Sequence, residues 1–265
     1  MSAPQPLTQE QIGKLYDLTG KVAIITGGAG FLGHASARGL AAFGADIVVT
    51  SRSISSLEAV ASEIKGLGRK ALPVACDVTD EASVDAMVAK VMEEFGHIDI
   101  LVTAAGIANR FPAEEFPVAE FNKIMTANVT GTFLSAQKVG QQMIKQGHGK
   151  IITIGSVRGF LGHPGGYAAY GTTKGAVHLM TQQLATEWAK YQINVNCIAP
   201  CIFWTPLTQQ VLEDEKLKQI FMSRIPWGRA AVPDDMIGPI VFYSSAASDF
   251  ITGTILPVDG GSVAG

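Results

Sequence analysis

The segment Gly155–Lys174 concentrates the residue types that could carry out acid–base chemistry: GSVRGFLGHPGGYAAYGTTK. Tyr170 and Lys174 are four residues apart, so in a helix they share one face. An ammonium beside a phenol favours the phenolate, so we expect a lowered Tyr170 pKa and a general acid/base that works near neutral pH. Ser156 follows the apolar run Ile151–Ile154, from where its hydroxyl could reach Tyr170. Taken alone, such a short pair is more often accidental than functional, so other segments must decide.

A glycine cluster near the N-terminus could hold a dinucleotide. Four glycines between Gly27 and Gly33 follow the apolar run Lys21–Thr26 and precede a helical pattern that ends at Phe43. Glycines let the backbone approach a pyrophosphate, and the N-terminus of the next helix offers unpaired N–H groups and a positive dipole end. Because the strand and the helix flank it as required, this cluster favours a dinucleotide site over a turn that binds nothing.

The end of the second predicted strand distinguishes between cofactors. A carboxylate there would bind the ribose hydroxyls of NAD. The chain has Thr50, Ser51 and Arg52 at this place, and no acid. A guanidinium grips a phosphate through two parallel hydrogen bonds, so we predict a preference for NADP(H), with NAD possible. The alternative is that Arg52 is an ordinary solvated arginine.

Apolar runs and helical patterns alternate along the whole chain. The predicted strands are 21–26, 45–50, 71–76, 98–104, 150–155, 194–198 and 254–258. The predicted helices lie between them, at 9–16, up to 43, 55–66, 80–95, 116–143, 167–191, 206–221 and 233–244. Continuously apolar strands that alternate with helices predict an α/β fold, with a doubly wound parallel sheet between two helical layers. A ligand would then bind at the carboxyl ends of the strands. The glycine cluster, Ala104–Gly106, Ser156 and Cys201 all follow predicted strands, so they would gather at this edge.

The composition narrows the class of protein. With 265 residues, 47% of them hydrophobic, and no linker, we expect one domain at 18–265, including a lid at about 201–225, after an arm at 1–17. A formal net charge of -3 gives no sign of a nucleic-acid or membrane surface. Three cysteines without metal-ligand spacing fit a reducing compartment and no metal site. The absence of a long apolar run and of a leader-like start predicts a cytoplasmic protein.

Together these motifs resemble the short-chain dehydrogenase/reductase family, in its short single-domain branch. They occur in the family's order: the glycine loop Thr26–Gly33, Asp77, Ala104-Ala105-Gly106, Asn128, Ser156, Tyr170-x-x-x-Lys174 and Val258-Asp259-Gly260-Gly261. The opening residues Tyr16–Val22 and the segment Ala199–Leu207 are similar to gluconate 5-dehydrogenase-type members, which act on sugar acids and polyols.

The resemblance implies a Rossmann-like fold and a hydride transfer that uses a nicotinamide cofactor. Tyr170 would exchange a proton with the substrate oxygen, and Ser156 would hydrogen-bond that oxygen. Lys174 would lower the Tyr170 pKa and bind the nicotinamide ribose, and Asn128 would hold a water of a proton relay. The implied cofactor contacts are Gly27, Gly30, Phe31, Leu32, Gly33, Ser51, Arg52, Asp77, Val78, Ala104, Ala105, Gly106, Tyr170, Lys174 and Thr205. Family members are commonly tetramers or dimers, so a homo-oligomer is expected.

The chain departs from the family pattern in four places. Phe31 stands where the middle glycine of the loop is usual, and Gly30 comes one position earlier. Thr103–Gly106 lacks the usual side-chain amide, and Cys201 replaces the glycine after Pro200. Ser156 and Tyr170 are fourteen residues apart, one more than usual, and Gly165-Gly166 could absorb the extra residue.

The substrate is harder to predict. We expect an alcohol or carbonyl compound, most readily a sugar acid, a polyol or a small ketone. Reduction of a 3-oxoacyl thioester is an alternative, and a dinucleotide-binding sensor without turnover is an alternative of another class. Arg158 could pair with a substrate carboxylate, although a solvated or structural arginine is the commoner case. Tyr167 is expected in the pocket wall or in packing. His163 is expected to be a loop histidine, and a contact with the substrate is the less common alternative.

Overall fold

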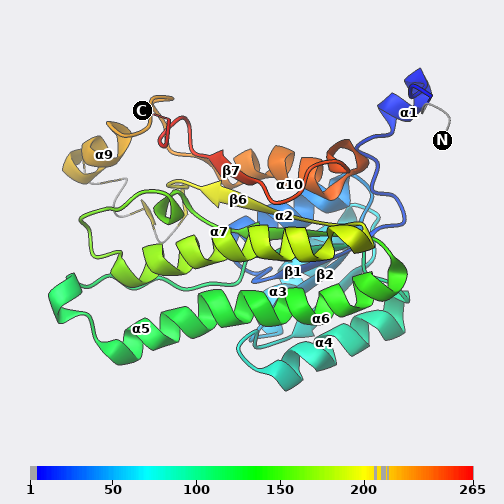
Figure 1. Ribbon diagram of the computed structural model, residues 1–265, viewed down its shortest axis with the longest axis horizontal. Helices are drawn as coiled ribbons and strands as arrows, with labels where there is room; N and C mark the ends of the chain where they lie inside the picture. The colour runs from blue at the N-terminus through cyan, green and yellow to red at the C-terminus, as the bar shows by residue number, and fades with distance from the viewer. Residues whose placement is uncertain (1–4, 206–207, 210–212, 214, 265) are drawn as a thin grey trace.

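The computed structural model describes residues 5–205, 208–209, 213 and 215–264. In these residues one parallel sheet has the strand order β3-β2-β1-β4-β5-β6-β7 (Figure 1). The strands are β1 Val22–Thr26, β2 Asp46–Ser51, β3 Ala71–Ala75, β4 Ile100–Thr103, β5 Gly149–Ile154, β6 Ile193–Pro200 and β7 Ile255–Val258. Every pair of neighbours is parallel, so all carboxyl ends lie at one edge. The predicted Rossmann-like α/β fold is confirmed.

Helices cover both faces of the sheet, as Figure 1 shows. The helices are α1 Gln9–Gly13, α2 Phe31–Ala42, α3 Ser55–Gly66, α4 Glu81–Phe95, α5 Val118–Met125, α6 Gly131–Gln146, α7 Ala168–Trp188, α9 Glu215–Met222 and α10 Ile237–Ser244. One buried cluster joins the sheet to α2, α3 and α10, and a second joins it to α4, α6 and α7. The molecule is therefore three-layered, as predicted.

The residues of β1 show why its sequence is apolar throughout. Ala23 and Ile25 belong to the first buried cluster, whereas Val22 and Ile24 belong to the second. Successive side chains of a strand point to opposite faces, so a strand covered on both sides needs apolar residues at every position. Full burial of each valine or isoleucine contributes about 1.5–3 kcal/mol, which makes the central strands the rigid base of the site.

The predicted helix at 116–143 is present but irregular. It begins at Val118, and a π-helical turn at Thr126–Thr130 separates α5 from α6. Gly131 follows this turn, and a Cβ added there would lie 2.7 Å from Cγ2 of Val78, in the loop after β3. A helix that passes so close to this loop needs glycine at the contact. π-helical turns are common at functional sites, and this one buries Asn128.

The other predicted helices and strands begin and end within about two residues of the observed bounds in most cases. The helix predicted at 206–221 is described in part: residues 208–209 and 213 are helical, and α9 covers Glu215–Met222. Residues 206–207, 210–212 and 214 lie outside the described residues. No helix in the described ranges is long and apolar enough to cross a membrane.

Candidate active site

The glycine loop between β1 and α2 meets the loop after β4. Gly27 has a φ of +66°, and a Cβ added to it would lie 2.7 Å from the backbone nitrogen of Ala105. A Cβ on Gly33 would collide with the carbonyl oxygen of Gly27. Gly27 therefore requires glycine for conformation and for space, and Gly33 requires it for space. The structure thus brings the predicted residues 27–33 and 104–106 side by side at the carboxyl edge.

The start of α2 fits a phosphate group. Its N-cap is Gly30, which has no side chain to bond the N–H groups of the first turn, and residues 29–31 are exposed. Unpaired N–H groups and the helix dipole make such an end an anion site. Phe31 occupies the first helical position and is exposed, so the departure from the usual glycine leaves the loop intact.

The residues predicted to bind the adenosine half of the cofactor lie close together, where β2 and β3 end. The Ser51 hydroxyl donates a 2.7 Å hydrogen bond to the Ser53 carbonyl, which holds the short loop around Arg52. The Asp77 carboxylate accepts hydrogen bonds from the backbone and the hydroxyl of Thr79, at 2.9 and 2.7 Å. These bonds, and to a smaller extent the charge of Arg52, lower the pKa of Asp77. Arg52 is exposed, as a residue that meets a cofactor phosphate must be.

Asn128 joins three elements of the site. Its side-chain amide donates to the Ile107 carbonyl at 2.9 Å and to the Thr173 hydroxyl at 3.0 Å, and its oxygen accepts from the Ile107 backbone at 2.8 Å. The Thr173 hydroxyl in turn donates to the Tyr170 carbonyl at 2.7 Å. Asn128 thereby fixes the loop after β4 against α7. The predicted water beside Asn128 stays a prediction.

Ser156, Tyr170 and Lys174 converge where β5 ends and α7 begins. The Ser156 hydroxyl accepts a hydrogen bond from the Arg158 backbone at 3.1 Å, donates one to the Pro200 carbonyl at 3.4 Å, and is buried. Lys174 lies with its ammonium nitrogen 5.5 Å from the centre of the Tyr170 ring and donates a 2.7 Å hydrogen bond to the Ile154 carbonyl. The three side chains that sequence reasoning grouped are thus neighbours in space.

The predicted lowering of the Tyr170 pKa by Lys174 is wrong in this structure. Burial raises the Tyr170 pKa, while the Ser156 hydrogen bond and the charge of Arg158 act in the opposite direction. The lysine is itself buried, with 7% of its surface exposed, and burial lowers its pKa from 10.5 to about 8. Its ammonium is directed to a backbone carbonyl and lies over the ring, so desolvation outweighs its attraction for the phenolate.

Thr205 is the one predicted cofactor residue that lies within the expected lid at about 201–225. Its backbone nitrogen donates to the Thr208 hydroxyl at 3.0 Å, and the two hydroxyls are 3.1 Å apart. This turn follows β6 and is half-buried. Its position at the carboxyl edge agrees with the predicted role, which the structure does not test.

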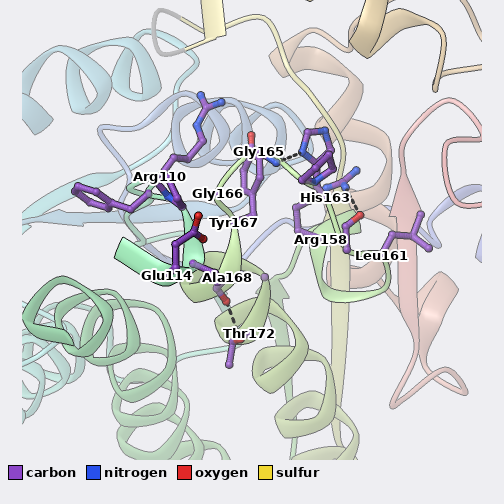
Figure 2. A pocket seen from close by; sticks show the side chains of 16 residues that line it. Arg110, Glu114, Arg158, Leu161, His163, Gly165, Gly166, Tyr167, Ala168 and Thr172 are labelled. Atoms are coloured by element: carbon purple, nitrogen blue, oxygen red, sulfur yellow. Dashed lines mark hydrogen bonds between the residues drawn. The ribbon is translucent and has the colours of Figure 1, made fainter. Parts of the chain in front are cut away.

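A pocket of about 710 Å³ opens beside the start of α7 (Figure 2). One wall is the segment Arg110–Glu114, and the other is the loop from Arg158 to Tyr167. The Arg110 guanidinium lies 5.3 Å from the centre of the Tyr167 ring. That ring also contacts the ring of Tyr170, with centres 6.1 Å apart. The pocket is thus next to the tyrosine, and Tyr167 belongs to its wall as expected.

Two residues that contribute to the site were not predicted from the sequence. Thr173 was not singled out, although its position beside Tyr170 on α7 could have suggested a contact with Asn128. His178 was not singled out either. It lies one turn after Lys174 on the same helix face, so the spacing of four residues was the available signal.

Comparison with known proteins identifies relatives over almost the whole chain. The family model for short chain dehydrogenases matches residues 21–216. Gluconate 5-dehydrogenase of Gluconobacter oxydans (strain 621H) is 39% identical over 247 residues, which are 93% of this chain and 96% of the relative. The 2-dehydro-3-deoxy-D-gluconate 5-dehydrogenase of Dickeya dadantii (strain 3937) is 42% identical over 250 residues, which are 94% of this chain and 98% of the relative.

A solved structure is also similar to this chain over nearly its whole length. The gluconate 5-dehydrogenase from Burkholderia cenocepacia J2315, in complex with NADP and tartrate, superposes with a TM-score of 0.91 at 38% sequence identity. The match covers 95% of this chain and 98% of that one.

Proposed function

The chain belongs to the short chain dehydrogenase family of NAD(P)-dependent oxidoreductases, and we propose that it transfers hydride between NADP(H) and a sugar acid. The observation that carries this proposal is the cluster of Ser156, Tyr170 and Lys174 beside a pocket that contains two arginines. The names of the two relatives, both of which are sugar-acid dehydrogenases, favour this substrate class over a plain polyol or a small ketone.

The residues present fit a nicotinamide dinucleotide. Three of the four residues between β1 and the start of α2 are glycines, which leaves the backbone there open to close approach, and the uncapped helix end would hold the pyrophosphate. Ser51 and Arg52 would meet the 2′-phosphate of NADP, and Asp77 would lie beside the adenine. When bound, the nicotinamide ring supplies or accepts the hydride. The loop around Arg52 carries no acid, which supports a preference for NADP(H) over NAD.

The side chains of this chain would handle the proton. Tyr170 would donate its phenolic proton to the carbonyl oxygen during reduction, and would take a proton from the alcohol during oxidation. Ser156 would hydrogen-bond the same oxygen and stabilise the charge that develops there. The Lys174 ammonium would stabilise the Tyr170 phenolate once it forms. The network through Asn128 and Thr173 would keep α7 in register with the loop after β4.

Reduction of a 3-oxoacyl thioester is the weaker candidate. An enzyme that accepts an acyl carrier protein needs a basic surface near the lid, yet Arg229 is paired with Asp235 at 2.7 Å. The third candidate, a sensor without turnover, has no support from the site because Ser156, Tyr170 and Lys174 are all present.

A substrate panel tests the proposal. The purified protein is incubated with NADPH or NADH and 5-keto-D-gluconate, other keto sugar acids, small ketones and 3-oxoacyl thioesters, and with NADP or NAD and the matching alcohols. We expect the highest kcat/KM with a sugar acid and NADP(H). Tyr170→Phe should lower kcat by a factor of about 10² or more while NADPH still binds. A thioester preferred over every sugar acid, or near-normal turnover by the variant, would overturn the assignment.

A further inference from the structure

The pocket beside the start of α7 has a distinct electrostatic character. Arg110 and Arg158 contribute positive charge, and Glu114 is the one carboxylate among the described lining residues (Figure 2). Burial and the charges of Arg158, Arg224 and Arg110 lower the pKa of His163 in the pocket wall. The charges of three arginines from separate segments therefore act on this histidine. A positive pocket in a chain of net charge -3 is a local arrangement and not a consequence of composition.

Arg158 is the arginine that connects this pocket to the reacting groups. It stands two residues after Ser156, and two residues span at most about 7 Å of backbone. Arg158 lines the pocket, and its charge acts on both Tyr170 and His163, so the guanidinium is within electrostatic reach of both groups. It is half-buried, and one of its nitrogens donates a 3.2 Å hydrogen bond to the Gly162 carbonyl. That bond fixes the guanidinium while other N–H groups stay able to bind an anion.

The pocket wall is otherwise built to hold its shape. The backbone nitrogen of Gly165 donates to Nδ1 of His163 at 3.0 Å, and the His163 ring contacts the Tyr167 ring with centres 5.1 Å apart. Gly166 has a φ of +75°, and a Cβ there would lie 2.8 Å from the Phe111 carbonyl oxygen. The two walls therefore meet through backbone at Gly166, which keeps the arginines of both walls at a fixed separation.

We propose that this pocket binds the carboxylate of the substrate and that Arg158 is its ion-pair partner. The inference rests on the proposed function, and it specifies that function further. The pocket is lined by Tyr167, Gly171 and Thr172 but not by Ser156 or Tyr170, so it lies beyond the reacting oxygen. The substrate must therefore carry its carboxylate several bonds from the carbon that exchanges hydride. A sugar acid that reacts near its far end meets this requirement, whereas a 2-hydroxy acid does not.

A neutral analogue separates charge recognition from shape. D-gluconate and D-gluconamide differ in the acid group alone, so their binding to the wild type, Arg158→Gln and Arg158→Lys is measured by calorimetry with saturating NADPH, with which an alcohol cannot react. A charge-assisted bidentate pair predicts that Arg158→Gln weakens gluconate binding about 10- to 100-fold and leaves gluconamide binding unchanged. Arg158→Lys should recover part of the loss. The affinity for NADP should stay the same in all variants.

Lys190→Gln is the matched control, because it removes one positive charge at the far end of α7, about 30 Å away along the helix. It should bind gluconate as the wild type does. Equal weakening of gluconate and gluconamide by Arg158→Gln, or undiminished gluconate binding, would overturn the subsite, as would a wild type that binds no gluconate. If Arg158-dependent gluconate binding is found but no sugar acid is turned over, the subsite stands and the proposed reaction fails.

Discussion

Replacing His178 by leucine should make the stability of the fold less sensitive to acid, by about 2 kcal/mol between about pH 7.5 and pH 5. His178 is buried under the Ser156 loop with 7% of its surface exposed. A Cβ on Gly155 would lie 2.5 Å from its Nε2, and the Phe160 ring lies with its centre 4.5 Å from the imidazole centre. Among the described residues, Nε2 has no hydrogen-bond partner. The site accepts a neutral imidazole and disfavours a charged one.

The magnitude follows from the histidine pKa. Burial first, and the nearby charge of Lys174 second, lower the His178 pKa from 6.5 to about 4. Between these values the unfolded chain binds more protons than the folded chain, so the free energy of unfolding falls as the pH decreases through this window. At about 1.4 kcal/mol per pKa unit, the full loss is about 3 kcal/mol below pH 4, of which about 2 kcal/mol is reached at pH 5. Above about pH 7.5 the histidine is almost fully neutral in both states and contributes almost no pH dependence.

Urea unfolding at fixed protein concentration, at about pH 7.5 and about pH 5, measures this effect. His178→Leu should be at least as stable as the wild type at the higher pH, because leucine has similar bulk and leaves no polar atom unpaired. It should then lose about 2 kcal/mol less on acidification. His34→Leu is the control, because the His34 side chain is 41% exposed and bonded to Glu63. This variant should not lose less stability than the wild type on acidification. An equal loss in His178→Leu and the wild type would refute the reasoning.

Two further predictions concern the cofactor and the proton. Ser51→Asp should raise the ratio of kcat/KM with NAD to kcat/KM with NADP about tenfold or more, because a carboxylate repels the 2′-phosphate and accepts from ribose hydroxyls; an unchanged ratio would remove Ser51 and Arg52 from the cofactor site. Because burial raises the Tyr170 pKa, kcat/KM for alcohol oxidation should increase with pH from about 6 to 9 as the base form becomes more populated, whereas kcat/KM for reduction should not increase. An oxidation profile that is flat over this range would contradict the assignment of Tyr170 as the base.

The sequence was most informative where local chemistry decides the structure. Helix α3 was predicted at its observed bounds, Ser55–Gly66, and the strands were recognisable because continuous apolar runs are needed between two helical layers. The glycine loop was equally readable, since Gly27 and Gly33 are required by backbone conformation and close contact. The neighbourhood of Ser156, Tyr170 and Lys174 followed from spacing and from the rule that parallel strands share a carboxyl edge.

What the sequence could not provide depends on contacts between distant segments. The π-helical turn before Gly131 accompanies a close contact with Val78, more than fifty positions earlier in the chain. The Tyr170 pKa depends on how much water folding removes, and a spacing of four residues carries no information about that. From the sequence alone, Arg158 looks like a surface arginine. Only the fold places it in the same pocket as Arg110, which lies in the opposite wall. The preferred cofactor and the oligomeric state stay predictions.

In the segment Gly155–Lys174, the two ends hold the proton-transfer residues and the middle lines the pocket, and contacts at both ends fix its position. At one end Gly155 lies directly on His178, which holds Ser156 in place. At the other end Gly166 adopts its positive φ against the Phe111 backbone, and α7 then begins and carries Tyr170. Between the anchors, Arg158 and residues 161–165 line the pocket without forming the proton-transfer site. Because both ends are fixed by backbone contacts that glycines make possible, side chains in the middle can change the substrate while Ser156 and Tyr170 keep their positions.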